Sequence, residues 1–136
     1  MTADEALKRF GLPAKAGFRD VIRALLEQQI VIEAKQEVFE PEILRTLCVQ
    51  LFSIGVAEDS LLIWKAKNCN FDAACGLDIQ FLCGAGLQAT KDFLSASTDS
   101  QAAKALDYVL GCEEAGDFEE WSPGKWIDYY RKYYRL

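Results

Sequence analysis

The sequence predicts an all-helical protein that forms a single domain over residues 1–136. Only 3 of its 136 residues are proline, so few positions would stop a helix. The β-branched runs that strands favour are few, and apolar residues recur at helical spacing. Hydrophobic residues make up 51% of the chain, which is enough for a core at this length. No linker or low-complexity segment divides it.

Two helices are predicted in the first 35 residues. The first covers 3–10 and ends before Gly11 and Pro13, two residues that disfavour a continued helix. The second covers 18–34, and Val21, Leu25 and Ile32 are among the side chains expected to face inward.

Two more helices follow at 41–54 and 58–67. Pro41 suits the first turn of a helix, and Gly55 follows the last residue of that helix. Glu58 and Asp59 introduce the next helix, because acidic side chains are favourable at a helix N-terminus.

Asn70 is a suitable cap for a fifth helix, predicted over 71–85 and ending at the glycines of 84–86. The remaining predicted helices cover 87–96, 99–115 and 125–135.

Three glycines suggest a repeat. Gly55, Gly86 and Gly116 are 31 and 30 residues apart, and each follows an apolar helical segment. The stretch QLFSIGVAEDSLLIW has a weak echo in QFLCGAGLQATKDFL and again in YVLGCEEAGDFEEW. A helix, a glycine turn and a returning helix form an antiparallel hairpin. Over about residues 40–120 the pattern resembles the short HEAT-like repeats, which implies hairpins stacked as a short α-solenoid. A non-repeating helical bundle is the alternative.

The charge is concentrated in one part of the chain. Residues 69–124 carry two basic side chains against ten acidic ones, whereas residues 125–136 carry a net +3. An acidic surface repels nucleic acid and anionic membranes and attracts basic proteins, although it can also serve solubility alone. The chain has no histidine, so histidine-dependent nucleophile pairs and metal sites are excluded. We therefore expect a binding protein and not an enzyme, without cofactor.

The segment CEEAGDFEEW, residues 112–121, is the candidate partner-binding site. Buried aromatic side chains within a polar rim are typical of interface hot spots. The alternative is that the two aromatic residues only pack the turn between helices. The candidate residues are Glu113, Glu114, Asp117, Phe118, Glu119, Glu120 and Trp121.

By size, charge and lack of catalytic motifs, the chain resembles the small acidic immunity proteins of bacterial toxin systems. That resemblance implies a partner that is a basic toxin, such as a nuclease, occluded through the acidic surface. A general helical-repeat scaffold or adaptor is the alternative function.

The five cysteines predict packing and not a metal or redox centre. Projected on a helix over 71–85, Cys75 lies within a broad apolar arc and Cys83 lies at its edge. The spacing from Cys69 to Cys75 and on to Cys83 does not match the short intervals of zinc sites. No metal is expected.

On the same projection Asp78 falls close to the middle of the apolar arc, so it is predicted to be a buried carboxylate. A buried carboxylate needs a partner, and Lys65, Lys67 and the indole of Trp64 are candidates. Tying two helices together is the structural interpretation of Asp78. Acid–base catalysis by Asp78 with Lys65 or Lys67 is the less favoured enzymatic alternative.

The segment GKWIDYYRKYYRL places Trp126, Tyr129, Tyr130 and Tyr133 in one stripe of a helix, which predicts a terminal helix that covers the last repeat. No apolar run reaches the about 20 residues that cross a bilayer. The opening MTADEALKRFG has no apolar secretory signal, so a cytoplasmic location is expected.

Overall fold

The computed structural model describes residues 1–35 and 41–136, and within them the chain is helical without a strand. The all-helical prediction is confirmed. The α-helices are α1 (Ala3–Phe10), α2 (Arg19–Lys35), α3 (Pro41–Ile54), α4 (Ser60–Lys67), α5 (Phe71–Gly76), α6 (Leu87–Ala96), α7 (Ala102–Glu114) and α8 (Pro123–Tyr133). Short 3₁₀ turns cover Ala16–Phe18, Ala57–Asp59 and Ile79–Cys83.

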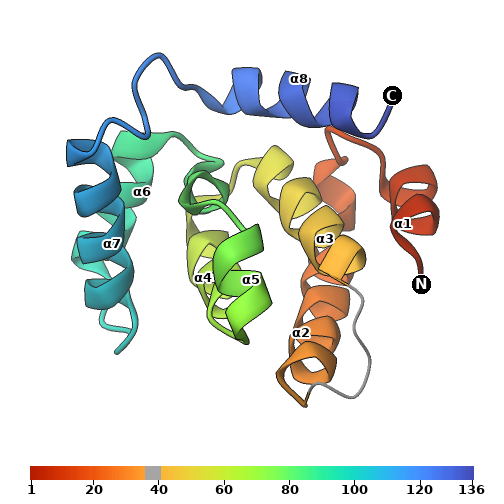
Figure 1. The fold of residues 1–136 in the computed structure, drawn as a ribbon, viewed down its shortest axis with the longest axis horizontal. Helices are drawn as coiled ribbons and strands as arrows, with labels where there is room; N and C mark the ends of the chain where they lie inside the picture. Colours follow the sequence, from red (N-terminus) through yellow and green to blue (C-terminus); the bar gives the residue numbers. More distant parts are fainter. Residues whose placement is uncertain (36–40) are drawn as a thin grey trace.

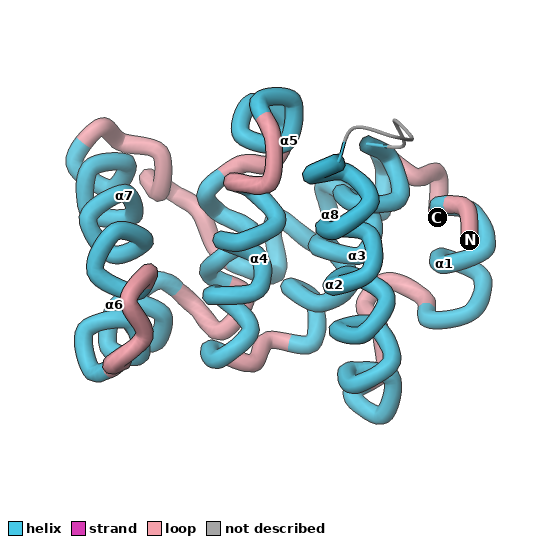
Figure 2. The backbone as a smooth tube through the Cα atoms, turned by 90° about the horizontal axis from the view of Figure 1, so that it is seen from below, coloured by secondary structure: helices cyan, strands magenta, loops and turns pink. Residues whose placement is uncertain are grey.

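The helices are arranged in neighbouring groups along one row. Figures 1 and 2 both show α6 beside α7 at one end, α4 and α5 in the middle, then α2 and α3, with α1 at the other end. The helix α2 packs extensively against α3, and α6 packs against α7. The two helices of each of these groups thus bury their apolar faces against each other.

The helix ends follow local capping rules. The Thr2 side chain accepts a hydrogen bond of 3.2 Å from the Glu5 amide at the start of α1, and Ser122 accepts one of 3.3 Å from the Lys125 amide at the start of α8. After α3, Gly55 adopts φ +81° and gives the chain a sharp turn that a side chain would disfavour.

Phe52 of α3 and Phe81 of the 3₁₀ turn Ile79–Cys83 lie in the core, where their ring centroids are 6.2 Å apart and the two side chains are at most 2% exposed. Gly84 passes so close to α3 that a Cβ atom built on it would lie 2.2 Å from the Phe52 carbonyl oxygen. Glycine is therefore required there by packing. Tyr130 of α8 closes the cluster, with its ring centroid 5.3 Å from that of Phe81.

Helix α8 runs along one edge of the row and does not lie over the α6–α7 group (Figure 1). It packs against α3, and the Tyr134 hydroxyl that follows it lies 2.9 Å from the hydroxyl of Thr46. The Tyr133 hydroxyl donates to Glu42 at 3.0 Å, and Arg131 donates to the carbonyl of Leu12. The prediction that the terminal helix covers the last group is therefore wrong, because α8 packs on α3 near the other end of the row.

The predicted helix over 71–85 is wrong. Helix α5 ends at Gly76, Leu77 and Asp78 are extended, and a 3₁₀ turn follows. The helical projection of this segment therefore does not hold. Asp78 is exposed and not buried, and Cys75 is exposed and not part of the core.

Side chains from two other helices stabilise this break. The Lys67 ammonium, at the end of α4, donates to the carbonyl oxygens of Ala74 and Leu77 at 2.6 Å each. The Arg45 guanidinium of α3 reaches the Gly76 carbonyl oxygen at 3.4 Å. These donors satisfy carbonyls at the end of α5 that a longer helix would have paired internally. Gly76 adds to the effect, because glycine is a poor helix former.

The inward face of α2 also differs from the prediction. Val21 and Leu25 are partly buried against the core as expected, but Ile32 is 37% exposed. The fully buried positions include Ile22 and, unexpectedly, the charged residue Glu33, which is 2% exposed. The Gln29 amide donates to the Glu33 carboxylate at 3.0 Å.

Candidate functional site

The predicted acidic site spans the end of α7 and its connection to α8. Glu114, Asp117, Glu119 and Glu120 are exposed. Glu113 is half-buried and forms an ion pair with Lys91 of α6, at 2.9 Å. The structure thus brings the five acids to one end of the row, and four of them are exposed.

The two aromatic residues of this segment face the protein. Phe118 is only 8% exposed, and its ring meets that of Trp121 edge-on at a centroid distance of 5.3 Å. Trp121 is half-buried and lies 6.2 Å from the ring of Phe52. This arrangement agrees with the alternative in which both residues pack the turn between helices. The accessible part of the candidate site is consequently its carboxylates.

A groove of about 390 Å³ lies between α5 and α7, and Asp78 and Asp117 both line it. The Lys67 side chain, 6% exposed, lies on its inner wall. Two hydrogen bonds to backbone carbonyls occupy this ammonium, and its nitrogen also lies 5.6 Å from the ring centroid of Tyr108. Burial lowers the pKa of Lys67, and the nearby Asp78 partly offsets this.

Asp78 is exposed as a residue, but its carboxylate lies against the groove wall. This partial burial raises its pKa, while attraction to Lys67 and Arg45 partly offsets the effect. No described basic side chain comes close enough to form an ion pair with Asp78. The structure therefore brings Asp78 near Lys67, as the sequence suggested, without forming the tie between helices that was predicted.

Lys65 lies on the other side of α4 and lines a separate groove. This second groove has a volume of about 380 Å³ and is mostly apolar, with Trp64 and Leu61 among its lining side chains. Helix α2 contributes Ile30 and Ala34. Lys65 is thus not a partner of Asp78, and Trp64, 8% exposed, packs edge-on against Tyr108 instead.

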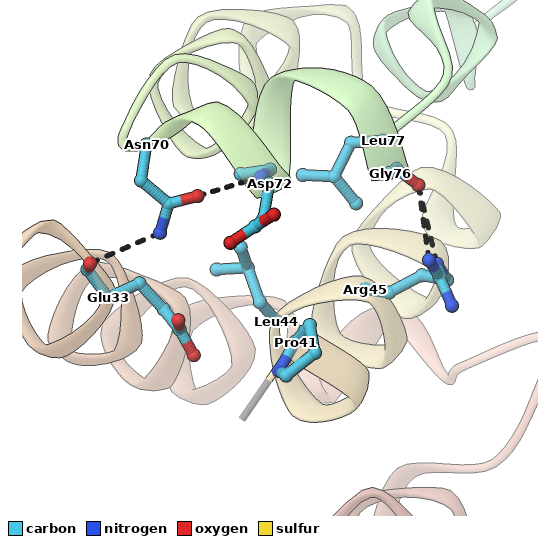
Figure 3. Close-up of a pocket in the computed structure, with 9 residues that line it drawn as sticks. Glu33, Pro41, Leu44, Arg45, Asn70, Asp72, Gly76 and Leu77 are labelled. Carbon is cyan, nitrogen blue, oxygen red and sulfur yellow. Dashed lines mark hydrogen bonds between the residues drawn. The ribbon is translucent and has the colours of Figure 1, made fainter. Parts of the chain in front are cut away.

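A third cavity lies where α5 meets α2 and α3 (Figure 3). The Asn70 amide donates to the Glu33 carbonyl oxygen at 3.1 Å, and its oxygen accepts from the Ala73 amide at 2.7 Å. On the opposite side, Arg45 donates to Gly76. The cavity measures about 20 Å³, room for about one water molecule, so this place serves to fix α5 and not to hold a ligand.

Asp59 is a second buried carboxylate besides Glu33, and the sequence predicted it only as the start of a helix. It is 1% exposed, and Arg19 of α2 holds both its oxygens, with Nε at 2.9 Å and Nη2 at 2.8 Å. Arg23 donates to the same carboxylate. Two arginines four residues apart lie on one face of a helix. That spacing is the sequence feature from which a shared acidic partner could have been predicted.

The cysteines are free and occupy different environments. Cys48 and Cys83 are fully buried, which confirms a packing role for Cys83, and burial raises the pKa of Cys83 to about 12. Cys69 is half-buried and Cys75 is exposed. Among the described residues, no three cysteine, aspartate or glutamate side chains are placed to hold a metal ion.

Comparison of the chain with protein-family models, curated sequences and solved structures gave no match. In residues 1–35 and 41–136, no helix has both the length and the hydropathy needed to cross a membrane. Function is therefore inferred from the chain's own residues.

Proposed function

We propose that this protein binds a basic protein and inhibits it by covering its functional surface. The observation that carries the proposal is the state of the acidic block, residues 69–124. None of its ten acidic residues is fully buried, and only Glu113 forms an ion pair. Because the remaining charges stay uncompensated at the surface, they generate a negative field that attracts and orients a cationic partner.

The proposed biological role is that of an immunity protein, which neutralises a basic toxin such as a nuclease in the cytoplasm of a bacterium. We propose that the helical groups form a short HEAT-like stack that presents the acidic segment 112–121 at one end. The exposed carboxylates would meet basic groups of the toxin. Phe118 and Trp121 would pack against the core and hold the segment rigid, so that binding costs less conformational entropy.

A scaffold that binds an apolar peptide is the second candidate, and the mostly apolar groove beside Trp64 favours it. Such binding would depend little on salt. Catalysis by Asp78 with Lys67 is the weakest candidate, because the Lys67 ammonium is occupied by two backbone carbonyls at 2.6 Å.

The test begins with affinity capture of the tagged protein from its native host at low and at high salt, followed by mass spectrometry. We expect one stoichiometric basic protein whose capture weakens as salt is added. Its affinity is then measured against a variant with five acids of the segment reversed to lysine: Glu113, Glu114, Asp117, Glu119 and Glu120. The expected loss is at least about 100-fold, as for interfaces that depend on close charge pairs.

A matched control reverses five exposed acids outside the acidic block, with the same change in net charge. These are Asp4, Glu5, Asp20, Glu27 and Glu58. The control should lose much less affinity than the segment variant. Equal losses would reject the segment as the binding site, and unchanged affinity in the segment variant would reject the whole assignment. Several partners held equally at both salt levels would favour the scaffold.

A further inference from the structure

The groove between α5 and α7 is the most polar of the large hollows described above. One wall is formed by the end of α5 and by Asp78, and the other by α7, with Asp117 of the acidic segment completing the rim. In Figure 1, α5 and α7 lie in the front of neighbouring groups of helices. A volume of about 390 Å³ is at the lower end of the range for ligand pockets, about 300–1,000 Å³, and suits one or two side chains.

The groove contains a positive charge, the Lys67 ammonium, which is already hydrogen-bonded to the backbone. Lys67 directs its ammonium to the carbonyl oxygens of Ala74 and Leu77, both at 2.6 Å. These bonds keep Lys67 at the end of α5, where it stabilises the helix terminus. Lys67 therefore attracts Asp78 only from a distance and forms no ion pair with it.

The two carboxylates of the rim have no cation of their own within the described chain. Asp78 precedes the 3₁₀ turn Ile79–Cys83 without making a side-chain cap, and neither Asp78 nor Asp117 forms an ion pair. Repulsion by Asp117 adds to the burial that raises the pKa of Asp78. A partly desolvated carboxylate beside a second one is stabilised when a cation is placed between them.

Aromatic surface is available in the same groove. Tyr108 is 47% exposed and lines the wall that α7 provides. Its ring already lies near the Lys67 ammonium, at 5.6 Å from nitrogen to centroid. Aromatic rings of this kind stabilise nearby cations and pack against the long methylene stems of basic side chains.

We propose that this groove receives a basic side chain of the partner protein, a guanidinium or an ammonium group, between Asp78 and Asp117. The proposal rests on the function proposed above, and it names the chemical group of the partner that the acidic surface binds. It also adds a residue, Asp78, that lies 34 positions before the acidic segment begins. The remaining carboxylates of that segment attract the partner, and the groove fixes its position.

The experiment uses two fluorescein-labelled probes, nona-arginine and nona-lysine, titrated into the full chain at near-physiological salt and followed by anisotropy. Wild type is compared with the single variant Asp78→Asn and with the double variant Asp78→Asn/Asp117→Asn. A control, Asp92→Asn/Asp107→Asn, removes two exposed acids of the same acidic block that do not line the groove. Circular dichroism confirms the helical fold of each variant.

We expect the double groove variant to bind the probe at least about tenfold more weakly than wild type, whereas the control changes by less than about threefold, as screened surface charges do. A loss for nona-arginine alone identifies a guanidinium site, and a loss for both probes identifies a site for either cation. Equal losses in the groove and control variants would overturn the proposal, because only net charge would then matter.

The single variant separates this inference from the proposed function, because Asp78 lies outside the segment 112–121. If the captured partner loses affinity when the segment is reversed but not when Asp78 is replaced, the groove inference fails and the proposed function stands. If no basic protein is captured but the probes still depend on Asp78, the proposed function fails and the groove remains a cation site.

Discussion

Gly84 allows the sharpest test of how this core is assembled, because its replacement by alanine adds a single atom at a place with no room. The added Cβ would lie 2.2 Å from the Phe52 carbonyl oxygen and 3.0 Å from its carbonyl carbon. Ordinary contacts of this kind begin at 3.4 Å. The 3₁₀ turn before Gly84 and helix α3 must therefore separate by about 1 Å, and such overpacking costs about 1–3 kcal/mol.

Gly111 provides the matched control, because it lies inside α7 and a Cβ atom added there would have nothing within 4 Å of it. The Gly111→Ala substitution should stabilise the protein by about 0.5–1 kcal/mol, since alanine is the better helix former. The two substitutions are chemically identical and should shift stability in opposite directions.

Thermal and urea unfolding, followed by circular dichroism, measure both effects. For a chain of this size, Gly84→Ala should lower the melting midpoint by about 3–12 °C, and Gly111→Ala should raise it by about 2–4 °C. A Gly84→Ala protein with the wild-type midpoint would refute the inferred close contact between Gly84 and α3.

Three further predictions concern individual side chains. Asp59→Ala should destabilise the fold by about 2–4 kcal/mol, because it removes a buried carboxylate that two partly exposed arginines hold. Urea unfolding measures this loss, and the control Asp20→Ala, at an exposed position, should stay within about 0.5 kcal/mol of wild type. The raised pKa of Asp78 means that the folded state holds this proton more tightly than the unfolded state, so its contribution to stability falls as pH rises through that pKa. Asp78→Asn should therefore gain stability over wild type as the pH is raised above the usual pKa of an aspartate, about 4. A stability difference that stays constant with pH would contradict this. Iodoacetamide should label Cys75 in the native protein but Cys83 only after unfolding, since Cys83 is fully buried. Peptide mass spectrometry measures the labelling, and a labelled Cys83 in the native protein would contradict its burial.

Local signals were sufficient for most of the helices. The predicted bounds 3–10, 41–54 and 87–96 are those of α1, α3 and α6. Each is marked by a residue next to it in the sequence, such as Pro41 at the start of α3 or Gly86 before α6. Because caps and glycine turns act over a few residues, they can be read without knowing the tertiary structure.

The end of α5 could not be predicted in this way. Its last carbonyls accept hydrogen bonds from Lys67 of α4 and Arg45 of α3. No residue next to position 77 in the sequence predicts either contact. With the helix interrupted, the expected faces of Cys75 and Asp78 changed. Tertiary contacts outweighed the apolar periodicity of the segment.

The candidate site was predicted in part. The acidic character of residues 113–120 is a property of composition, so its exposure could be anticipated. The inward packing of Phe118 depends on the position of Trp121 beside Phe52. The groove requires Asp78 and Asp117 to line one hollow although they are 39 positions apart in the sequence. Such juxtapositions follow from the tertiary fold alone.

The path of α8 also has a kinetic consequence. Its contacts to Leu12, Glu42 and Thr46 join residues that are 119, 91 and 88 positions apart, which raises the contact order of a protein whose other packing is mainly between neighbours. During synthesis α1 and α3 are made well before α8, so the surface that α8 covers stays exposed to solvent until α8 is made. The packing at the α1–α3 end of the row is therefore completed only when α8 docks there.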